Sequence, residues 1–239
     1  MPRLKLATTN GVILDNFSSG SGSGSSVTIS YTVGLDDGIL ILCTGAQDSN
    51  DANLPITTAT YNGVALTKLR SDTNNNDIRS EIWYLVDPPV GTYNLVFGTG
   101  TGVWKAGIVS SWGNVPIVST TDTSAGGSGN SSSPSASITP TYEYTLLISS
   151  LCSKSARTAL GSTQASLGTV QGQSFQNLSA SYIVTGGTIA TAVSASLSSG
   201  ADWNVSLGTF KSETPIDGER TAVTGGRTAL VRSKLTVGQ

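Results

Sequence analysis

The sequence predicts an all-β fold: a single antiparallel β-sandwich, jelly-roll-like, with extended N- and C-terminal arms. Three observations lead to this prediction. Asn62-Gly63 separates two β-prone runs, and both residues tolerate the positive φ angles of a type I′ hairpin turn. Apolar and polar residues alternate over 27–33 and 92–97, which is the period of a half-buried strand. Charged residues make up only 12% of the chain, too few for a long-helix protein.

Residues 1–25 are predicted to form an N-terminal arm. Asn10-Gly11 gives a second hairpin signal within residues 3–17. The run of Gly and Ser over residues 18–26 has the composition of a flexible linker. In this prediction the arm is a small hairpin, joined by a linker to the domain that begins at residue 26.

The β-sandwich domain is predicted over residues 26–211, with about ten strands separated by turn residues. Three runs are apolar on both faces, as the central strands of a sheet are: residues 38–46, 81–86 and 144–152. Two further runs are expected to be strands with a tryptophan on an apolar face. They are residues 103–112, with Trp104, Ala106, Ile108 and Trp112 aligned, and residues 202–211, with Trp203, Val205 and Leu207 aligned.

Turn-forming residues divide these strands. Pro88-Pro89 and Gly91 cannot continue a strand, so a sharp corner is expected there. Gly186-Gly187 gives a third hairpin signal between two β-prone runs. Residues 119–137 are rich in Ser, Gly and Thr and are predicted to be a long loop, whereas residues 154–176 carry no clear pattern.

Residues 212–239 are predicted to form a basic C-terminal arm. From Arg220 onward the sequence contains four bases and no acid, and residues 228–237 place apolar residues largely on one side and basic residues on the other. Such a segment can add a strand to the sheet edge of a neighbouring subunit. The alternative is that both ends are solvated tails. The candidate partner-binding residues are Arg3, Lys5, Arg220, Arg227, Val231, Arg232, Lys234, Leu235 and Val237.

The sequence excludes several classes of enzyme. It contains no His, which excludes every His-dependent triad and metal cluster, and it has no GxSxG, P-loop or Rossmann glycine motif. A pair of carboxylates meeting in space remains open. The acids nearest to loops or strand ends are Asp48, Asp51, Asp72, Asp77, Glu81 and Glu143. We expect no enzymatic activity and no cofactor.

Three other features each allow a functional and a structural interpretation. Residues 72–77 faintly resemble a calcium loop but lack its Gly and its distant Glu, so a polar turn explains them equally well. The four tryptophans could stack on sugars if two or more face solvent, although core positions are favoured. Cys43 and Cys152 lie in apolar strands and are expected to be buried free thiols, with a disulfide as the alternative.

Charge and hydropathy also limit the partners. The net charge of −2 offers no footprint for nucleic acid, and no window approaches the roughly 18 apolar residues of a membrane span. Residues 1–10 lack the apolar region of a signal peptide. We therefore expect neither nucleic acid nor a membrane as partner.

The central stretch resembles a β-sandwich family found in tailed-phage virion proteins and environmental surface proteins. The matching segments are SVTISYTV, GILILCTGAQD, YNGVALTKL, EIWYLVDPPVGTYNLVF, AGIVSSW and NVSLGTFK, in this order over about residues 26–211. The sharpest motifs cover residues 61–69 and 81–97. The chain departs from the family at residues 112–115, where only part of its usual turn is kept. The family supplies no catalytic residues.

The resemblance implies a surface-displayed structural module. The expected function is that of a virion structural protein, a phage capsid decoration or turret protein. It would be made in the host cytoplasm, displayed on the virion surface, and bound through its arms to the major capsid protein and to copies of itself. The alternatives are a glycan- or receptor-binding module of a tail fibre or baseplate, and a surface filament subunit that polymerises by donating strands.

Overall fold

A computed structural model of the protein describes residues 11–36, 38–47, 55–74, 78–100, 102–171 and 176–212, together with the backbone of 219–224 and 227–232. This part of the chain is built from antiparallel strands and contains no helix. The all-β sandwich fold predicted from the sequence is confirmed.

The N-terminal half of the chain forms two sheets. Sheet A has the strand order β1 (Ile13–Gly22), β9 (Trp104–Gly113), β3 (Gly38–Gln47), β7 (Ile78–Val86) and β6 (Thr67–Asn74). Sheet B has the order β2 (Ser26–Val33), β8 (Gly91–Gly98), β4 (Thr58–Tyr61) and β5 (Val64–Ala65). The two sheets pack face to face over the first core cluster, which includes Tyr31, Leu42, Tyr61, Trp83 and Phe97.

The C-terminal half forms two more sheets. Sheet C has the order β10 (Thr121–Ser131), β17 (Ala201–Lys211), β12 (Tyr144–Ser153), β15 (Asn177–Gly186) and β14 (Ala165–Gln171). Sheet D has the order β11 (Ser135–Ile138), β16 (Thr191–Leu197) and β13 (Arg157–Leu160). Another core cluster, which includes Leu147, Val193, Trp203 and Leu207, fills the space between them.

The two halves have the same topology. When β5 is left out of the count, the strands β1, β9, β3, β7 and β6 of sheet A have the same order along the first half as β10, β17, β12, β15 and β14 of sheet C have along the second. The same holds for β2, β8, β4 of sheet B and β11, β16, β13 of sheet D, with β5 as an addition in the first half. The body is therefore two sandwiches of one design, which sequence analysis predicted as one.

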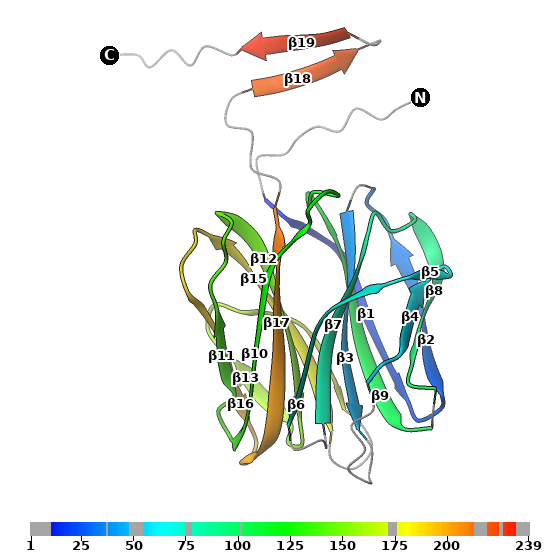
Figure 1. Ribbon diagram of the computed structural model, residues 1–239, viewed down its shortest axis with the longest axis vertical. Helices are drawn as coiled ribbons and strands as arrows, with labels where there is room; N and C mark the ends of the chain where they lie inside the picture. The colour runs from blue at the N-terminus through cyan, green and yellow to red at the C-terminus, as the bar shows by residue number, and fades with distance from the viewer. Residues whose placement is uncertain are drawn as a thin grey trace.

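The two sandwiches pack through sheets A and C, so that the layers follow one another as B, A, C, D (Figure 1). The shared core between A and C contains two aromatic contacts at equivalent places. Trp112 of β9 meets Tyr182 of β15 with ring centroids 4.9 Å apart, and Phe210 of β17 meets Tyr84 of β7 at 5.8 Å. Because exchanging the halves exchanges these two pairs, the interface has an approximate two-fold axis.

A carboxylate on the first strand of each half closes the sandwich in the same way. Asp15 accepts hydrogen bonds from the backbone N–H of Gly34, at 2.8 Å, and from Ser111 Oγ, at 2.7 Å. Its counterpart Asp122 accepts from the backbone N–H of Thr141, at 2.9 Å, and from Thr209 Oγ1, at 3.1 Å. Each aspartate thus ties its first strand to the loop after the second strand and to the last strand.

Several predicted elements are confirmed. Asn62 and Gly63 have φ angles of 50° and 77° in the turn between β4 and β5, as a type I′ hairpin requires. The doubly apolar runs form β3, β7 and β12, and each pairs with a neighbour on both sides. Gly91 has a φ angle of 135° where the chain crosses from β7 in sheet A to β8 in sheet B.

The predicted N-terminal arm over residues 1–25 needs correction, because residues 13–22 form β1 at the edge of sheet A. Gly20 serves close packing here rather than flexibility, since a Cβ atom on it would lie 2.9 Å from Ile29 Cγ1 of β2. Met1 to Asn10, with Arg3 and Lys5, lie outside the described residues.

Two predictions in the second half were wrong. Residues 119–137 are not a long loop, because they contain β10 and β11, whose Ser and Gly residues give no apolar alternation. Gly186-Gly187 does not close a hairpin either. β15 pairs with β12 and β14 in sheet C, whereas β16 pairs with β11 and β13 in sheet D. Residues 154–176, left without a prediction, contain β13 and β14.

Candidate functional site

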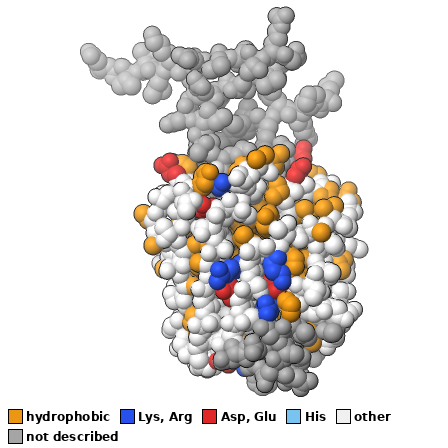
Figure 2. All heavy atoms as spheres, in the orientation of Figure 1, with side chains coloured by type: hydrophobic (Ala, Val, Ile, Leu, Met, Phe, Trp, Pro, Cys, Tyr) orange, Lys and Arg blue, Asp and Glu red, His pale blue; other side chains and the backbone are white. Residues whose placement is uncertain are grey.

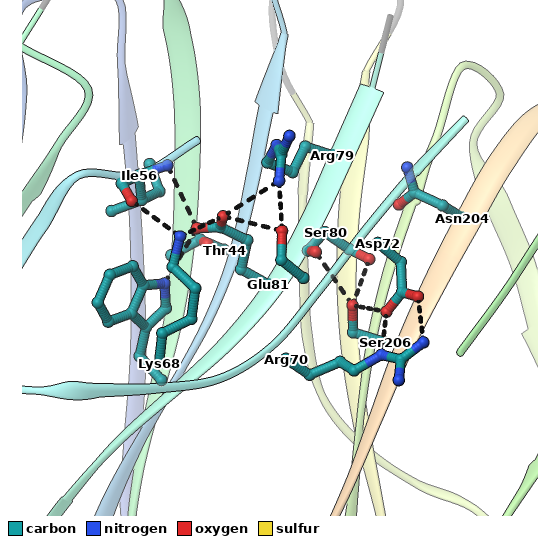
Figure 3. A network of polar contacts seen from close by, with 12 residues as sticks. Thr44, Ile56, Lys68, Arg70, Asp72, Arg79, Ser80, Glu81, Asn204 and Ser206 are labelled. Carbon is teal, nitrogen blue, oxygen red and sulfur yellow. Dashed lines mark hydrogen bonds and ion pairs between the residues drawn. The ribbon is translucent and has the colours of Figure 1, made fainter. Parts of the chain in front are cut away.

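The densest group of charged side chains lies on β6 and β7 (Figure 3). Its centre is the Glu81 carboxylate, whose side chain is 1% exposed. Lys68 Nζ lies 2.8 Å from Glu81 Oε1, and Arg79 Nη1 lies 3.7 Å from the same oxygen. Trp83 Nε1 and the backbone N–H of Ile56 donate to Glu81 Oε2, at 3.1 and 3.2 Å. Two cationic side chains and two N–H donors therefore surround this carboxylate.

A second carboxylate, Asp72, lies on the neighbouring strand β6. Arg70 donates to both of its oxygens, at 2.6 and 2.8 Å, in the bidentate geometry that favours arginine–carboxylate pairs. Ser206 Oγ of β17 donates to Asp72 at 2.7 Å and also forms a hydrogen bond with Ser80 Oγ at 2.9 Å. This group therefore joins sheet A to sheet C.

Glu81 and Asp72 do not form a catalytic pair, because they lie on opposite faces of sheet A. Glu81 contacts Ile56 and Trp83, which belong to the core between sheets A and B. Asp72 contacts Ser206 of sheet C. The sheet itself lies between the two carboxylates, so they cannot act on one reacting atom. Both acids stabilise contacts between layers.

The other predicted acids are not brought together by the described residues. Asp48, Asp51 and Asp77 lie outside them, and Glu143 lies exposed in the loop between β11 and β12. Among the described residues, no group of three or more Cys, Asp or Glu side chains could hold a metal ion. The faint calcium loop over residues 72–77 is only partly described, and its first acid is occupied by Arg70.

A small cavity lies between sheets C and D. Its volume is about 10 Å³, about what one water molecule needs. Its lining mixes Ser149 and Ser179 of sheet C with Val193 and Ala195 of sheet D. This cavity fits a bound water rather than a substrate.

The tryptophans do not form a sugar-stacking platform. Trp83, Trp112 and Trp203 are buried, with exposed fractions of 7%, 1% and 7%. Trp104 is half-buried and packs against the core between sheets A and C. All four serve as core anchors, so the glycan-binding alternative loses the surface on which it was based.

Both cysteines are buried and free, as expected from the sequence. Both lie between sheets A and C. Cys43 of sheet A faces sheet C, and its Sγ lies 4.0 Å from the carbonyl oxygen of Ser149 on β12. A Cβ atom on Gly45 of β3 would lie 3.2 Å from Cys152 Sγ. Burial raises the pKa of each thiol to about 12. Neither thiol is therefore an available nucleophile near neutral pH.

The predicted partner-binding residues of the C-terminal arm are described only in part. The strands β18 (Glu219–Thr224) and β19 (Arg227–Arg232) pair with each other as an antiparallel hairpin. Arg220 lies opposite Val231, Arg227 opposite Thr224, and Arg232 opposite Glu219. Lys234, Leu235 and Val237 lie outside the described residues, as do Arg3 and Lys5.

The described body begins at Gly11 and ends at Ser212, so the term arms now refers to residues 1–10 and 213–239, and the two points at which they join the body lie side by side. A Cβ atom on Gly11 would be 3.4 Å from Ser212 Oγ. Asn114 Nδ2 donates to the carbonyl oxygen of Gly11 at 3.2 Å. The backbone N–H of Ser212 donates to the carbonyl oxygen of Tyr144 at 2.9 Å. Figure 1 shows the start of β1 and the end of β17 together at the upper end of the body.

The loops around these points form a surface that sequence analysis did not identify. We call it the arm-exit surface and define it by three exposed apolar residues, Ile117, Val118 and Ile189, and three exposed acids, Asp36, Asp87 and Glu143. In Figure 2 hydrophobic and acidic side chains gather at this upper end of the face shown. Ile117-Val118 and Ile189 were the available signal, since apolar residues in loops are uncommon unless something covers them.

In three comparisons, no protein-family model, no curated protein and no solved structure matches the chain. The part of the chain that the structure describes includes no helix long and apolar enough to cross a membrane.

Proposed function

We propose that the chain is a virion structural protein, a capsid decoration or turret protein of a phage. Its sandwich body is displayed on the particle surface, and its arms bind the major capsid protein and neighbouring copies. The observation that carries the proposal is the common exit of both arms: Gly11 and Ser212 lie together at one end of the body. A body with both arms at one end can be anchored there and project away from a shell.

The distribution of charge supports anchoring through the arms. Within the body, the charged side chains on β6 and β7 bind one another: Lys68 and Arg79 pair with Glu81, and Arg70 pairs with Asp72. The C-terminal arm from Arg220 onward carries bases without acids. Basic arms on a body of net negative charge suit an acidic protein partner.

The resemblance in sequence supports the same proposal. The segments YNGVALTKL and EIWYLVDPPVGTYNLVF, which resemble phage virion sandwiches, form the β4–β5 hairpin with the start of β6, and the β7–β8 crossing. These are structural elements of the first sandwich, and two of their charged residues, Lys68 and Glu81, pair with each other. The proposal therefore assigns the protein a role in assembly and no catalytic role.

Deletion of residues 219–239 tests the proposal. The described core lies within residues 12–212, so the shortened chain is expected to keep its far-UV circular dichroism and thermal midpoint. Its incorporation into particles, measured by co-sedimentation with shells, should be lost. A matched control is the full chain with the body residues Lys154 and Arg157 replaced by Gln, which should be incorporated normally. Normal decoration by the shortened chain would contradict the proposal.

A further inference from the structure

We propose that the arm-exit surface binds the C-terminal segment, residues 219–237, of a second copy of this chain, so that two copies exchange arms. This inference rests on the proposed function in one respect, that the arm binds a neighbouring chain. It adds the receptor surface and the identity of one partner. Four observations support it.

The first observation is the apolar exposure of the arm-exit surface. Val118 and Ile189 are 77% and 69% exposed, the largest values among the exposed large hydrophobic residues, and Ile117 is 49% exposed. These side chains come from the loop that joins the two halves, residues 114–120, and from a loop of the second half, residues 187–190. Exposed apolar residues that gather from separate loops mark an interaction surface.

The second observation is that these loops meet where the arm begins. The backbone N–H of Lys211 donates to the carbonyl oxygen of Thr120 at 2.8 Å, which holds the end of the 114–120 loop beside the end of β17. The backbone N–H of Gly187 donates to the carbonyl oxygen of Glu143, which joins the 187–190 loop to the loop before β12. The loops that carry Ile117, Val118, Ile189 and Glu143 are thus tied to strands that end beside the exit of the arm.

The third observation is charge complementarity. Asp36, Asp87 and Glu143 are exposed on the arm-exit surface. The nearby base Lys211 is largely buried and lies over the ring of Tyr142, with Nζ 3.9 Å from the ring centroid. The arm from Arg220 onward has four bases, no acid and several apolar residues. An acidic, apolar surface and a basic, apolar segment have matching chemistry.

The fourth observation concerns the hairpin itself. Among the described strands, β18 and β19 pair only with each other and join none of the four sheets. A lone two-stranded hairpin is marginally stable in water and needs a further surface to pack against. Each copy carries one arm and one arm-exit surface. In a dimer with a two-fold axis, each arm could therefore pack against the arm-exit surface of the other copy. The linker of residues 213–218 can span about 20 Å, which permits this exchange.

The oligomeric state of the full chain is the first test, by size exclusion with light scattering. The wild-type chain should be a dimer, and Val118→Asp with Ile189→Asp should shift it to monomer. The control is Val64→Asp, which places the same charge on another exposed apolar residue, 46% exposed, on the β4–β5 hairpin. The control should remain dimeric. A monomeric wild-type chain at about 100 μM, or an unchanged dimer in the double variant, would overturn the inference.

A charge-exchange experiment identifies the segment and distinguishes exchange from an arm folded onto its own body. One variant carries Asp36→Lys, Asp87→Lys and Glu143→Lys; the other carries Arg220→Glu, Arg227→Glu, Arg232→Glu and Lys234→Glu. Each alone should dimerise at least about tenfold more weakly. An equimolar mixture should form heterodimers, because each reversed partner then meets its complement. Failure of the mixture to restore dimers would overturn the exchange.

These measurements separate the inference from the proposed function. They use purified protein and report self-association alone, whereas co-sedimentation with shells reports incorporation into particles. If the charge-exchange mixture fails while deletion of the arm still abolishes incorporation, the arm binds the shell and not a second copy. If dimers form and exchange but incorporation does not depend on the arm, the proposed function is wrong and the dimer interface remains.

Discussion

The first and second sandwiches share a strand order but differ in what fills them. The core between sheets A and B holds a row of tyrosines, with Tyr31, Tyr61 and Tyr93 in edge-to-face contact at 6.3 and 5.7 Å. The described residues of the core between sheets C and D form no such row and are Leu, Val, Ile and Ala side chains with Trp203. The same topology is therefore compatible with quite different side-chain packing, as core redesigns also show.

Some side-chain contacts are the same in both halves, and these show which contacts the shared topology depends on. Both retain the aspartate that joins the first strand to the last, Asp15 and Asp122. Each half also contributes one residue to each of the two aromatic contacts in the shared interface. These features fix how strands and halves meet, so the equivalence of the halves should appear in measured stability as well as in topology.

The largest effect is expected for the aromatic residues of the shared core. Trp112→Ala and Phe210→Ala occupy equivalent positions, and the two side chains are 1% and 0% exposed. Each should lower the free energy of unfolding by about 3–5 kcal/mol, because a large buried side chain leaves a cavity. Urea unfolding followed by tryptophan fluorescence and circular dichroism should give one coincident transition in Phe210→Ala. Two separated transitions would show that the halves unfold independently.

The next largest effect distinguishes the halves. Glu81 has no counterpart acid on β15, the equivalent strand of the second half. Glu81→Ala leaves Lys68 and Arg79 without their carboxylate, so the free energy of unfolding should fall by about 3 kcal/mol. Glu143→Ala, at an exposed site, should change it by less than about 0.5 kcal/mol. Equal effects in urea titrations of the two variants would contradict a structural role for the Glu81 network.

The two thiols, one from each half, should give an alkaline loss of stability. Their pKa in the folded protein is raised from 9.0 to about 12 by burial, so the folded state holds these protons more tightly than the unfolded state. Stability is therefore complete below about pH 9 and falls as the pH rises toward 12. Between pH 8 and pH 10 each thiol should account for about 1 kcal/mol of the loss.

The variants Cys43→Ala and Cys152→Ala isolate this effect. The free energy of unfolding should fall less between pH 8 and pH 10 in each variant than in the wild type, by the amount that one thiol contributes. The two variants should behave alike, since both thiols are buried. The tyrosines remain in both variants, so any slope they contribute cancels in the comparison. A pH dependence identical to that of the wild type would show that the thiols are not protected in the folded state.

The smallest effect tests the equivalence of the aspartates. Asp15→Ala and Asp122→Ala each remove a carboxylate that accepts a backbone N–H and a hydroxyl group. Each should lower the free energy of unfolding by about 1–2 kcal/mol, because both sites are only half-buried. Thermal unfolding should show similar shifts for the two variants. A large effect from one and none from the other would break the equivalence.

Sequence reasoning predicted the strands that have a clear local signal. The Asn62-Gly63 turn and the doubly apolar β3, β7 and β12 could be identified because turn chemistry and burial on both faces leave a pattern along the chain. Half-buried strands of small polar residues leave a weaker pattern. β10 is an edge strand made mainly of Ser, Gly and Thr, and none of its residues is fully buried, so it shows no apolar alternation.

The duplication and the candidate site were harder to predict for a different reason. The halves correspond through strand order and through Asp15 and Asp122, which are too few residues to stand out in a chain of low complexity. The arm-exit surface combines residues from loops far apart in sequence, so only the folded chain brings Asp36, Val118 and Ile189 to one end. The basic character of the C-terminal arm could be recognised from the sequence, because it depends only on the residues along the terminus.

The stacking of four layers has a consequence for backbone dynamics. β3 and β12 are hydrogen-bonded on both edges and covered on both faces, so no route leads from water to their amides without separation of whole sheets. Deuterium uptake at the middle of these two strands should therefore be the slowest in the chain and should proceed at the rate set by global opening.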